Sequence, residues 1–282
     1  METLIVIPAR YGSKRFPGKP LAVLAGKPIL QRVWEIAEFV CSRRSNCSAV
    51  VATETPSENC PSDKIVDFCR AAGIPVVVTS DACRSGSDRA WEVASAAERR
   101  PDVVVNLQGD VPTCPPDFVL RLIAALESDP DSSVASVYVQ LSWDALDALR
   151  AAKRESPFSG TTTVLDANER ALWFSKNIIP AIRKESELRA ASPTSPVKRH
   201  VGLYAYRYDA LKFFANSTQS YYERLEQLEQ LRFLENGYRI KMIEGAYPQG
   251  YDQTTSGVDS QDDLARVEEI IRKNGELLDF YR

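Results

Sequence analysis

Short, uninterrupted runs of aliphatic residues constrain the fold of this chain most strongly. The clearest are Leu-Ile-Val-Ile at residues 4–7 and three consecutive valines at both 76–78 and 103–105. None of these runs alternates apolar with polar residues, which is typical of strands that are covered on both faces. We therefore predict a parallel sheet with helices packed on each side.

Helical patterns separate these runs along the first half of the chain. The predicted order is strand 4–7, helix 29–40, strand 49–53, helix 64–72, strand 76–79, helix 88–98, strand 103–108, helix 116–127 and strand 134–141. Repeated strand–helix units are connected by right-handed crossovers. This order predicts an α/β fold with a doubly wound, mostly parallel sheet.

The pattern changes after about residue 150. We predict paired strands at 161–165 and 171–175, a mobile loop at 184–197, a strand at 200–206, one helix at 224–235, a strand at 240–243 and a terminal helix at 262–278. Two prolines favour the loop, and Asn236-Gly237 is typical of a helix end. We interpret residues 151–245 as an insert within a single domain that spans residues 1–282.

Charge and composition exclude several classes of function. The formal net charge of −3 and the pI near 5.5 argue against a surface that coats nucleic acid. No stretch reaches the ~18 apolar residues of a membrane span, and the first residues lack the basic segment of a signal peptide. We expect a cytoplasmic protein with no nucleic-acid or membrane partner.

The cysteines and the single histidine, His200, do not have the clustered spacing of a zinc site. Six cysteines are scattered along the chain without C-x-x-C pairs. We expect reduced, mostly packed thiols, and a disulfide between Cys41 and Cys47 stays open as an alternative.

The loop predicted after the first strand, residues 8–20, is rich in cations, glycine and proline. It carries Arg10, Lys14, Arg15 and Lys19. Glycines let backbone N–H groups approach an anion closely, and prolines stiffen the loop. The segment matches neither the Walker nor the G-x-G-x-x-G pattern. We interpret it as an anion-binding loop, with a solvated basic turn as the alternative.

Three further polar segments lie near predicted strand or helix ends, and ligands of open α/β sheets bind at the carboxyl ends of strands. Asp110 follows an apolar strand and either holds Mg²⁺, which binds through one or two carboxylates plus substrate phosphates, or caps a helix. Asp259 is either the N-cap of the last helix or a second metal ligand. In residues 83–89, Ser87 or Asp88 either caps a helix or belongs to a loop that contacts a base or phosphate.

Together these motifs resemble those of the CMP-Kdo synthetases, the 3-deoxy-manno-octulosonate cytidylyltransferases. The matching stretches occur in the family's order at 10–21, 85–89, 106–110, 200–204, 228–232 and 257–259. The resemblance implies a Rossmann-like nucleotidyltransferase fold, with CTP and an acidic acceptor as substrates. It also implies Mg²⁺ as the cofactor and a homodimer, with residues 151–245 as the acceptor-binding and dimerisation subregion.

The resemblance further implies a role for each matching polar residue. The residues assigned to the nucleotide are Arg10, Ser13, Arg15, Lys19, Ser85 and Arg89. The residues assigned to the acceptor are Gln108, His200, Tyr204, Glu229 and Gln230, and those assigned to the metal are Asp110 and Asp259. Arg15, Lys19 and Asp110 would be catalytic, because they stabilise charge while an acceptor oxygen displaces pyrophosphate from the α-phosphorus of CTP. We expect His200 to hydrogen-bond the acceptor and not to act as a base.

Two departures from the family's usual pattern fall where the acceptor should bind. Val111-Pro112-Thr113 stands where the family usually has Glu-Pro-Leu, and threonines 161–163 stand where a lysine is usual. We predict a Kdo-type sugar acid as the acceptor, with its 8-amino analogue or a small phosphonate acid as alternatives. A nucleotide-binding homologue without turnover is a further alternative, which the retained Asp110 and Asp259 disfavour.

Overall fold

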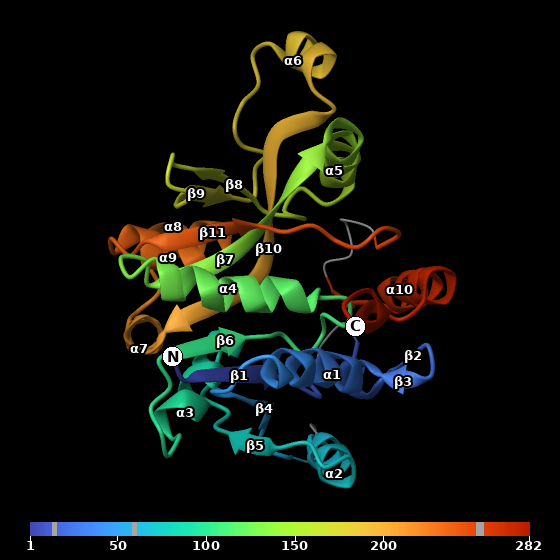
Figure 1. Cartoon of the computed structure of the whole chain (residues 1–282), viewed down its shortest axis with the longest axis vertical. Helices are drawn as coiled ribbons and strands as arrows, with labels where there is room; N and C mark the ends of the chain where they lie inside the picture. The colour runs from blue at the N-terminus through green and yellow to red at the C-terminus, as the bar shows by residue number, and fades with distance from the viewer. Residues whose placement is uncertain (13–15, 58–60, 252–256) are drawn as a thin grey trace.

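One mixed sheet organises the computed structural model, which describes residues 1–12, 16–57, 61–251 and 257–282 (Figure 1). Its strands follow the order β11–β7–β10–β6–β1–β4–β5, and β8 and β9 join through β10. They are β1 (Thr3–Pro8), β4 (Cys47–Glu54), β5 (Val76–Thr79), β6 (Val103–Asn106), β7 (Val134–Ser142), β8 (Thr162–Leu165), β9 (Ala171–Ser175), β10 (Thr194–Arg207) and β11 (Ile240–Glu244). A separate hairpin consists of β2 (Val23–Leu24) and β3 (Lys27–Pro28).

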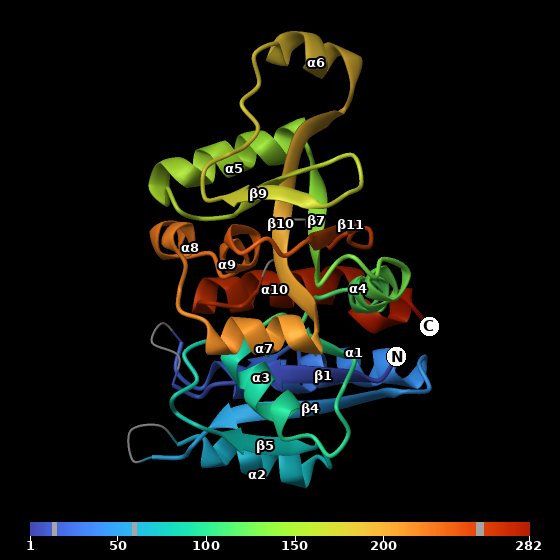
Figure 2. The same ribbon diagram turned by 90° about the vertical axis from the view of Figure 1, so that its left-hand side faces the viewer.

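The predicted parallel pairing is confirmed for β5–β4–β1–β6 and for β7–β11. Strand β10 is the exception, because it lies between β6 and β7 and runs antiparallel to both. Figure 2 shows that β10 runs from near α6, past β9, down to the level of α7 and β1 in the middle of the molecule. A segment from the second half of the chain thus completes the centre of the sheet.

Helices cover both faces of this sheet. On one face are α1 (Ile29–Ser42), α2 (Asp63–Ala71) and α4 (Pro116–Ser128), and on the other α3 (Gly86–Ser95), α7 (Tyr208–Asn216) and α9 (Gln230–Glu235). In β1, Ile5 and Ile7 pack in the core of the first face and Val6 in the core of the second, and all three are fully buried. Burial on both faces therefore explains the apolar runs at 4–7 and 103–105, as predicted. The prediction is wrong for the run at 76–78, because β5 is an edge strand on which Val77 and Val78 are 41% and 46% exposed.

The remaining helices lie toward the ends of the sheet. They are α5 (Trp143–Glu155), α6 (Glu185–Ala191), α8 (Tyr221–Glu226), α10 (Gln261–Asn274) and the short 3₁₀ turns η1 (Lys19–Leu21) and η2 (Leu277–Phe280). The sequence pattern did not predict α5 or α7. Within the described residues, no helix combines the length and the apolar character that a membrane crossing requires.

The prediction of one helix over residues 224–235 is wrong. The chain leaves the helix at Gln227, which has a left-handed backbone (φ 53°, ψ 45°), and α9 begins only at Gln230. An ion pair folds the two short helices against each other, because Arg232 Nη2 lies 2.5 Å from Glu223 Oε1 and both side chains are buried. Tertiary pairing overrides helix propensity here, and the break places residues 227–230 at a cavity.

The prediction of a mobile loop at 184–197 is also wrong. Residues 185–191 form α6, and β10 begins at Thr194. The polar side chains of α6 form ion pairs with α5, in which Arg189 contacts Asp147 and Glu185 contacts Arg150. The prolines are accommodated at the start of β10, which is an acceptable place for a residue without a backbone N–H. The assignment of residues 151–245 as a subregion of a single domain stays a prediction.

Candidate active site

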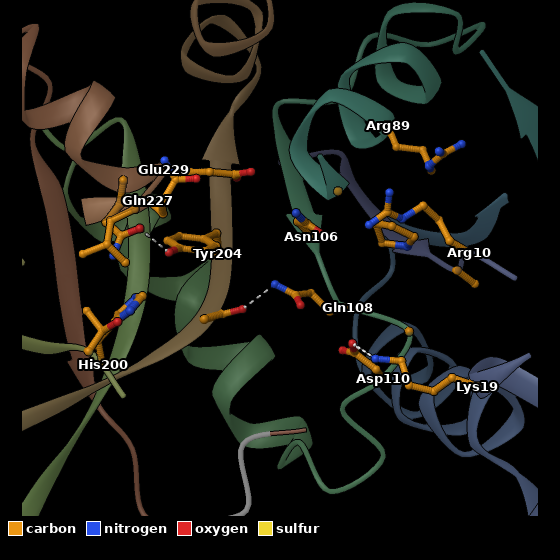
Figure 3. A pocket seen from close by; sticks show the side chains of 18 of the residues that line it. Arg10, Lys19, Arg89, Asn106, Gln108, Asp110, His200, Tyr204, Gln227 and Glu229 are labelled. Atoms are coloured by element: carbon orange, nitrogen blue, oxygen red, sulfur yellow. Dashed lines mark hydrogen bonds and ion pairs between the residues drawn. The ribbon is translucent and has the colours of Figure 1, made fainter. Parts of the chain in front are cut away.

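A cavity of about 770 Å³ lies at the carboxyl ends of β1 and β6 (Figure 3). We call its first wall the loop half, which comprises the loops after β1 and β6, η1 and the start of α3. We call its second wall the β10 half, which comprises residues 160–161, β10 and the α8–α9 connection. Gln108, from the loop after β6, is counted with this wall because it bonds to Gly202. Figure 3 shows Arg10, Lys19 and Asp110 on one side, facing His200 and Tyr204 on the other. The position agrees with the rule for open α/β sheets.

The loop after β1 is anchored by Glu54, at the end of the neighbouring strand β4. The backbone N–H groups of Tyr11 and Gly12 donate to Glu54 Oε1 at 2.8 and 3.1 Å. Gly18, with its left-handed φ of 71°, closes the loop by donating its N–H to the carbonyl of Tyr11 at 2.9 Å. Sequence reasoning missed Glu54, although a carboxylate that directly follows a predicted strand was a usable signal.

Two nucleotide assignments in this loop, Ser13 and Arg15, lie outside the described residues. Arg10 is exposed and lines the cavity. Lys19 is 7% exposed, begins η1 and also lines the cavity. The described part of the loop thus brings two of its cations to this wall.

Lys19, Asp110 and Asp259 meet at one point of the loop half. Lys19 Nζ lies 2.6 Å from Asp110 Oδ2 and 3.0 Å from Asp259 Oδ1. Burial alone would lower the pKa of the Lys19 ammonium, but the two carboxylates outweigh it and raise the pKa above its usual value. The structure therefore places the predicted metal ligands side by side and puts a lysine between them.

The capping alternatives for the two aspartates are not what the structure shows. The N-cap of α10 is Ser260, whose side chain accepts from the N–H of Asp263, and the carboxylate of Asp259 pairs instead with Lys19. No helix begins directly after Asp110, since α4 starts at Pro116. The backbone joins the two segments, because the N–H of Val258 donates to the carbonyl of Asp110 at 2.9 Å.

These aspartates suit a hard divalent cation. Carboxylate oxygens are ligands that Mg²⁺ prefers, and it usually takes one or two of them together with substrate phosphates and water. Among the residues that the structure describes, no His, Cys, Asp or Glu joins the pair to make a group of three. The donor set therefore fits a magnesium ion whose remaining ligands come from a phosphate-bearing substrate.

Gly109 is required by the close approach of two strand ends. A Cβ atom at this position would lie 2.7 Å from the carbonyl oxygen of Pro8, closer than real Cβ atoms come to backbone. The N–H of Gly109 donates to the same oxygen at 3.1 Å. The glycine of Gln-Gly-Asp thus fixes Asp110 beside the loop after β1.

The start of α3 contributes a cap and a link across the cavity. Ser85, and not Ser87 or Asp88, is the N-cap, in a capping box with Asp88. Ser87 Oγ instead donates to Glu229 Oε2 at 2.8 Å, across the two walls. Arg89 is 2% exposed, lines the cavity and donates to Thr79 Oγ1. Sequence reasoning missed the link from Ser87, because its partner is 142 residues away.

The β10 half carries mostly uncharged polar side chains, with the half-buried Arg199 as its one cation among the described residues. Tyr204 donates its hydroxyl to Gln230 Oε1 at 2.9 Å, and Gln108 Nε2 donates to the carbonyl of Gly202 at 3.2 Å. Burial raises the pKa of the Glu229 carboxyl, which favours its neutral form. The five residues assigned to the acceptor therefore all line one cavity with the nucleotide loop.

His200 is held as a neutral imidazole. Its Nε2 lies 2.8 Å from Ser136 Oγ, and its ring packs edge-on against Phe174. Burial, and then the positive charge of Lys176, lower the pKa of His200 to about 3. At neutral pH this side chain offers a hydrogen bond and not a positive charge.

Two buried polar atoms at the cavity lack a partner within the described structure. They are Asn106 Oδ1 and Gln230 Nε2, and both residues line the cavity. Buried polar atoms are normally hydrogen-bonded, so an unpaired donor and acceptor here indicate groups that a ligand or solvent satisfies.

Comparisons with known proteins agree with this geometry. A family model described as cytidylyltransferase matches residues 4–241. The 3-deoxy-manno-octulosonate cytidylyltransferase of Maricaulis maris (strain MCS10) is 38% identical over 99% of this chain and 100% of its own length. The mitochondrial 3-deoxy-manno-octulosonate cytidylyltransferase of Arabidopsis thaliana is 33% identical over 95% of this chain and 82% of its own length.

A solved structure gives the same result. The structure of CMP:2-keto-3-deoxy-manno-octonic acid synthetase complexed with CTP has a TM-score of 0.78 and 32% identity, and the match covers 97% of this chain and 99% of that one. The fold is that of a Rossmann-like nucleotidyltransferase. The chain belongs to the cytidylyltransferase family, among the 3-deoxy-manno-octulosonate cytidylyltransferases.

Proposed function

We propose that this protein transfers CMP from CTP to 3-deoxy-manno-octulosonate and releases pyrophosphate. The observation that carries the proposal is one cavity with two unlike walls, a loop half rich in charged groups and a β10 half of mostly uncharged polar side chains with the cation Arg199. A polyphosphate suits the first wall and a polyhydroxylated acid the second. The names of the relatives that match nearly the whole chain support the same substrates.

In this proposal the loop half binds the nucleotide. Arg10 and Lys19, together with Ser13 and Arg15, neutralise the triphosphate, and Ser85 and Arg89 lie along the cytidine. Glu54 holds the backbone of the loop, so the cations are positioned before CTP arrives. Preorganised charge of this kind stabilises the departing pyrophosphate without rearrangement during the reaction.

Asp110 and Asp259 would hold Mg²⁺. When bound, Mg²⁺ offsets the charge of the phosphates and makes the attacking hydroxyl more acidic. The chain itself places the two carboxylates at the mouth of the phosphate loop through Gly109 and the Val258–Asp110 backbone contact. Asp110 acts by position and charge, because phosphoryl transfer depends mainly on alignment and electrostatics.

The β10 half would orient the acceptor so that one hydroxyl oxygen faces the α-phosphorus. Gln108, His200, Tyr204, Glu229 and Gln230 provide donors and acceptors that match several sugar hydroxyls. The neutral His200 binds by hydrogen bonding, since an imidazole with a pKa of about 3 is a weak base. The unpaired Gln230 Nε2 is a natural donor to the acceptor.

We further infer a homodimer in the cytoplasm, where CTP is available. An apolar surface on β9 and α8 supports the dimer, because Leu172, Tyr221 and Leu225 are 58%, 60% and 63% exposed. The two elements are adjacent, since the rings of Trp173 and Tyr222 lie 5.1 Å apart. Leu225→Arg should convert the dimer to a monomer by light scattering, while Val77→Arg on the distant β5 should not. A wild-type monomer at micromolar concentration would refute this assembly.

A pyrophosphate-release assay tests the function directly. CTP and Mg²⁺ are combined with 3-deoxy-manno-octulosonate, its 8-amino analogue, a sialic acid and a small phosphonate acid in parallel. We expect the largest kcat/KM with 3-deoxy-manno-octulosonate. Turnover with none of the acids, while CTP still raises the melting temperature, would instead identify a nucleotide-binding homologue without turnover.

A further inference from the structure

Lys19 occupies a position where it competes with a metal ion. Its ammonium contacts one oxygen of Asp110 and one of Asp259, at 2.6 and 3.0 Å (Figure 3 shows the first contact). Two adjacent carboxylates repel each other unless a cation lies between them. In the free protein that cation is a side chain of the same loop that is expected to bind phosphate.

The two cations cannot share these oxygens at low cost. Mg²⁺ binds carboxylate oxygens at about 2.1 Å and tolerates little distortion of its octahedral shell. An ammonium that remained on the same two oxygen atoms would lie directly against the metal and be repelled by it. The ammonium therefore has to move before both carboxylates can bind a metal.

The cavity offers Lys19 another place to bind. Lys19 lines the cavity together with Arg10 and Gly12, where the proposed function places the triphosphate. A lysine ammonium is a compact charge on a flexible four-carbon stem, so it can exchange a carboxylate for a phosphate oxygen by side-chain rotation. Nucleotide binding thus supplies both a new partner for Lys19 and additional oxygen ligands for the metal.

We propose that Lys19 is a built-in counter-cation that keeps Asp110 and Asp259 closed to divalent metal until nucleotide binds. The inference rests on the proposed function, in which these two aspartates hold Mg²⁺. The free protein binds metal weakly, and CTP and metal bind with mutual reinforcement. Thermodynamic linkage requires the same coupling in both directions, so metal also tightens CTP binding.

Direct binding of Mn²⁺ to the nucleotide-free protein tests this role without measuring turnover. Mn²⁺ replaces Mg²⁺ because the free ion gives an electron paramagnetic resonance signal that falls when protein binds it. We expect Lys19→Met to bind Mn²⁺ at least about tenfold more tightly than the wild type, since it removes two charge-assisted contacts that compete with the metal. Mn²⁺ alone should then raise the melting temperature of Lys19→Met but not that of the wild type.

Three further variants make the test specific. Lys27→Met is the matched control, because Lys27 pairs with Glu35 at 2.9 Å and does not contact the two aspartates, so its Mn²⁺ affinity should equal that of the wild type. Asp110→Asn added to Lys19→Met should abolish the gain and so locate the ion. Lys19→Gln gives the same expected gain and replaces Lys19→Met if the apolar side chain prevents folding.

The outcomes separate this inference from the proposed function. Measurable and equal Mn²⁺ affinity of the nucleotide-free wild type and the Lys19 variants would overturn the inference and leave the metal site standing. Two negative results together would show that the metal site itself is wrong, and the inference would fall with it. These results are that Mn²⁺ does not increase the CTP affinity of the wild type in calorimetry, and that Mn²⁺ binds to neither Lys19→Met nor Lys19→Gln.

Discussion

The two halves of the cavity differ in charge and in where their residues come from. The loop half brings Arg10, Lys19 and Asp110 together in or near loops at strand ends, and Lys19 also contacts Asp259, whose side chain is 46% exposed. The β10 half uses mostly uncharged side chains, with Arg199 as the exception, and they come mainly from a strand and a broken helix pair. In the proposed function, one wall therefore selects its ligand mainly by charge, and the other mainly by the pattern of hydrogen bonds.

This contrast has an energetic consequence. Charged residues in a partly solvated loop cost little to keep without a ligand, particularly when Lys19 neutralises the two carboxylates. Buried polar atoms without partners are costly, and Gln230 Nε2 is such an atom. A site with buried, unpaired polar atoms therefore rejects a ligand that lacks the matching group more strongly than a partly solvated, charged site does.

The largest effect should come from the charged half. Asp110→Asn keeps the side-chain shape but removes a carboxylate from the centre of the loop half. Turnover should fall by about 10²–10³-fold, the typical loss when one preorganised electrostatic contact is removed. Pyrophosphate release at saturating CTP and acceptor measures this change. Asp117→Asn, at an exposed position on α4, is the control and should retain wild-type turnover. Wild-type turnover in Asp110→Asn would refute the assignment of Asp110 as a catalytic metal ligand.

Substitutions at two glycines test whether the two halves of the cavity are equally closely packed. Gly109→Ala in the loop half places a Cβ atom 2.7 Å from the Pro8 carbonyl oxygen. Because this distance is too short, the backbone at one of the two positions has to shift. The free energy of unfolding should fall by about 1–3 kcal/mol, as for other overpacked sites. In the β10 half, Gly202→Ala places its Cβ 3.9 Å from Gln108 Nε2 and should be tolerated. Urea unfolding of both variants makes the comparison, and equal losses would contradict it.

The sequence predicted the loop half better than the β10 half for a physical reason. Loops that follow buried strands in a parallel sheet meet at one edge, so Lys19 and Asp110 were placed correctly from strand order alone. Ser87 was missed because its role depends on a partner 142 residues away, whereas Glu54 was missed although it directly follows a predicted strand. The break at Gln227 was missed because it depends on the buried Arg232–Glu223 pair, which local helix propensity does not register.

The single histidine gives the β10 half a pH signature. The pKa of His200 is lowered to about 3 in the folded protein, mainly by burial, from 6.5. Because the unfolded chain takes up the proton first, the stability is fully present above pH 6.5 and is lost as the pH falls toward 3. The free energy of unfolding should therefore drop by roughly 2 kcal/mol from this residue between pH 7 and 5.

His200→Gln isolates this contribution, because glutamine keeps a hydrogen-bonding side chain without a titrating group. The variant should lose less stability than the wild type between pH 7 and 5 in urea titrations. Parallel pH curves for the two proteins would show that the imidazole is not held neutral by burial. The acidic groups contribute equally to both curves, so the difference between them belongs to His200.

The smallest expected effect tests whether the β10 half selects by hydrogen bonding. Tyr204→Phe removes the hydroxyl that donates to Gln230 Oε1 and leaves a buried acceptor unpaired. Because this change falls on the acceptor wall, KM for 3-deoxy-manno-octulosonate should rise roughly tenfold while KM for CTP stays within about twofold. Tyr208→Phe is the matched control, since Tyr208 packs against Trp91 and does not line the cavity. An equal rise in both KM values would mean that the two halves do not act as separate binding walls, and that Tyr204 supports the cavity as a whole.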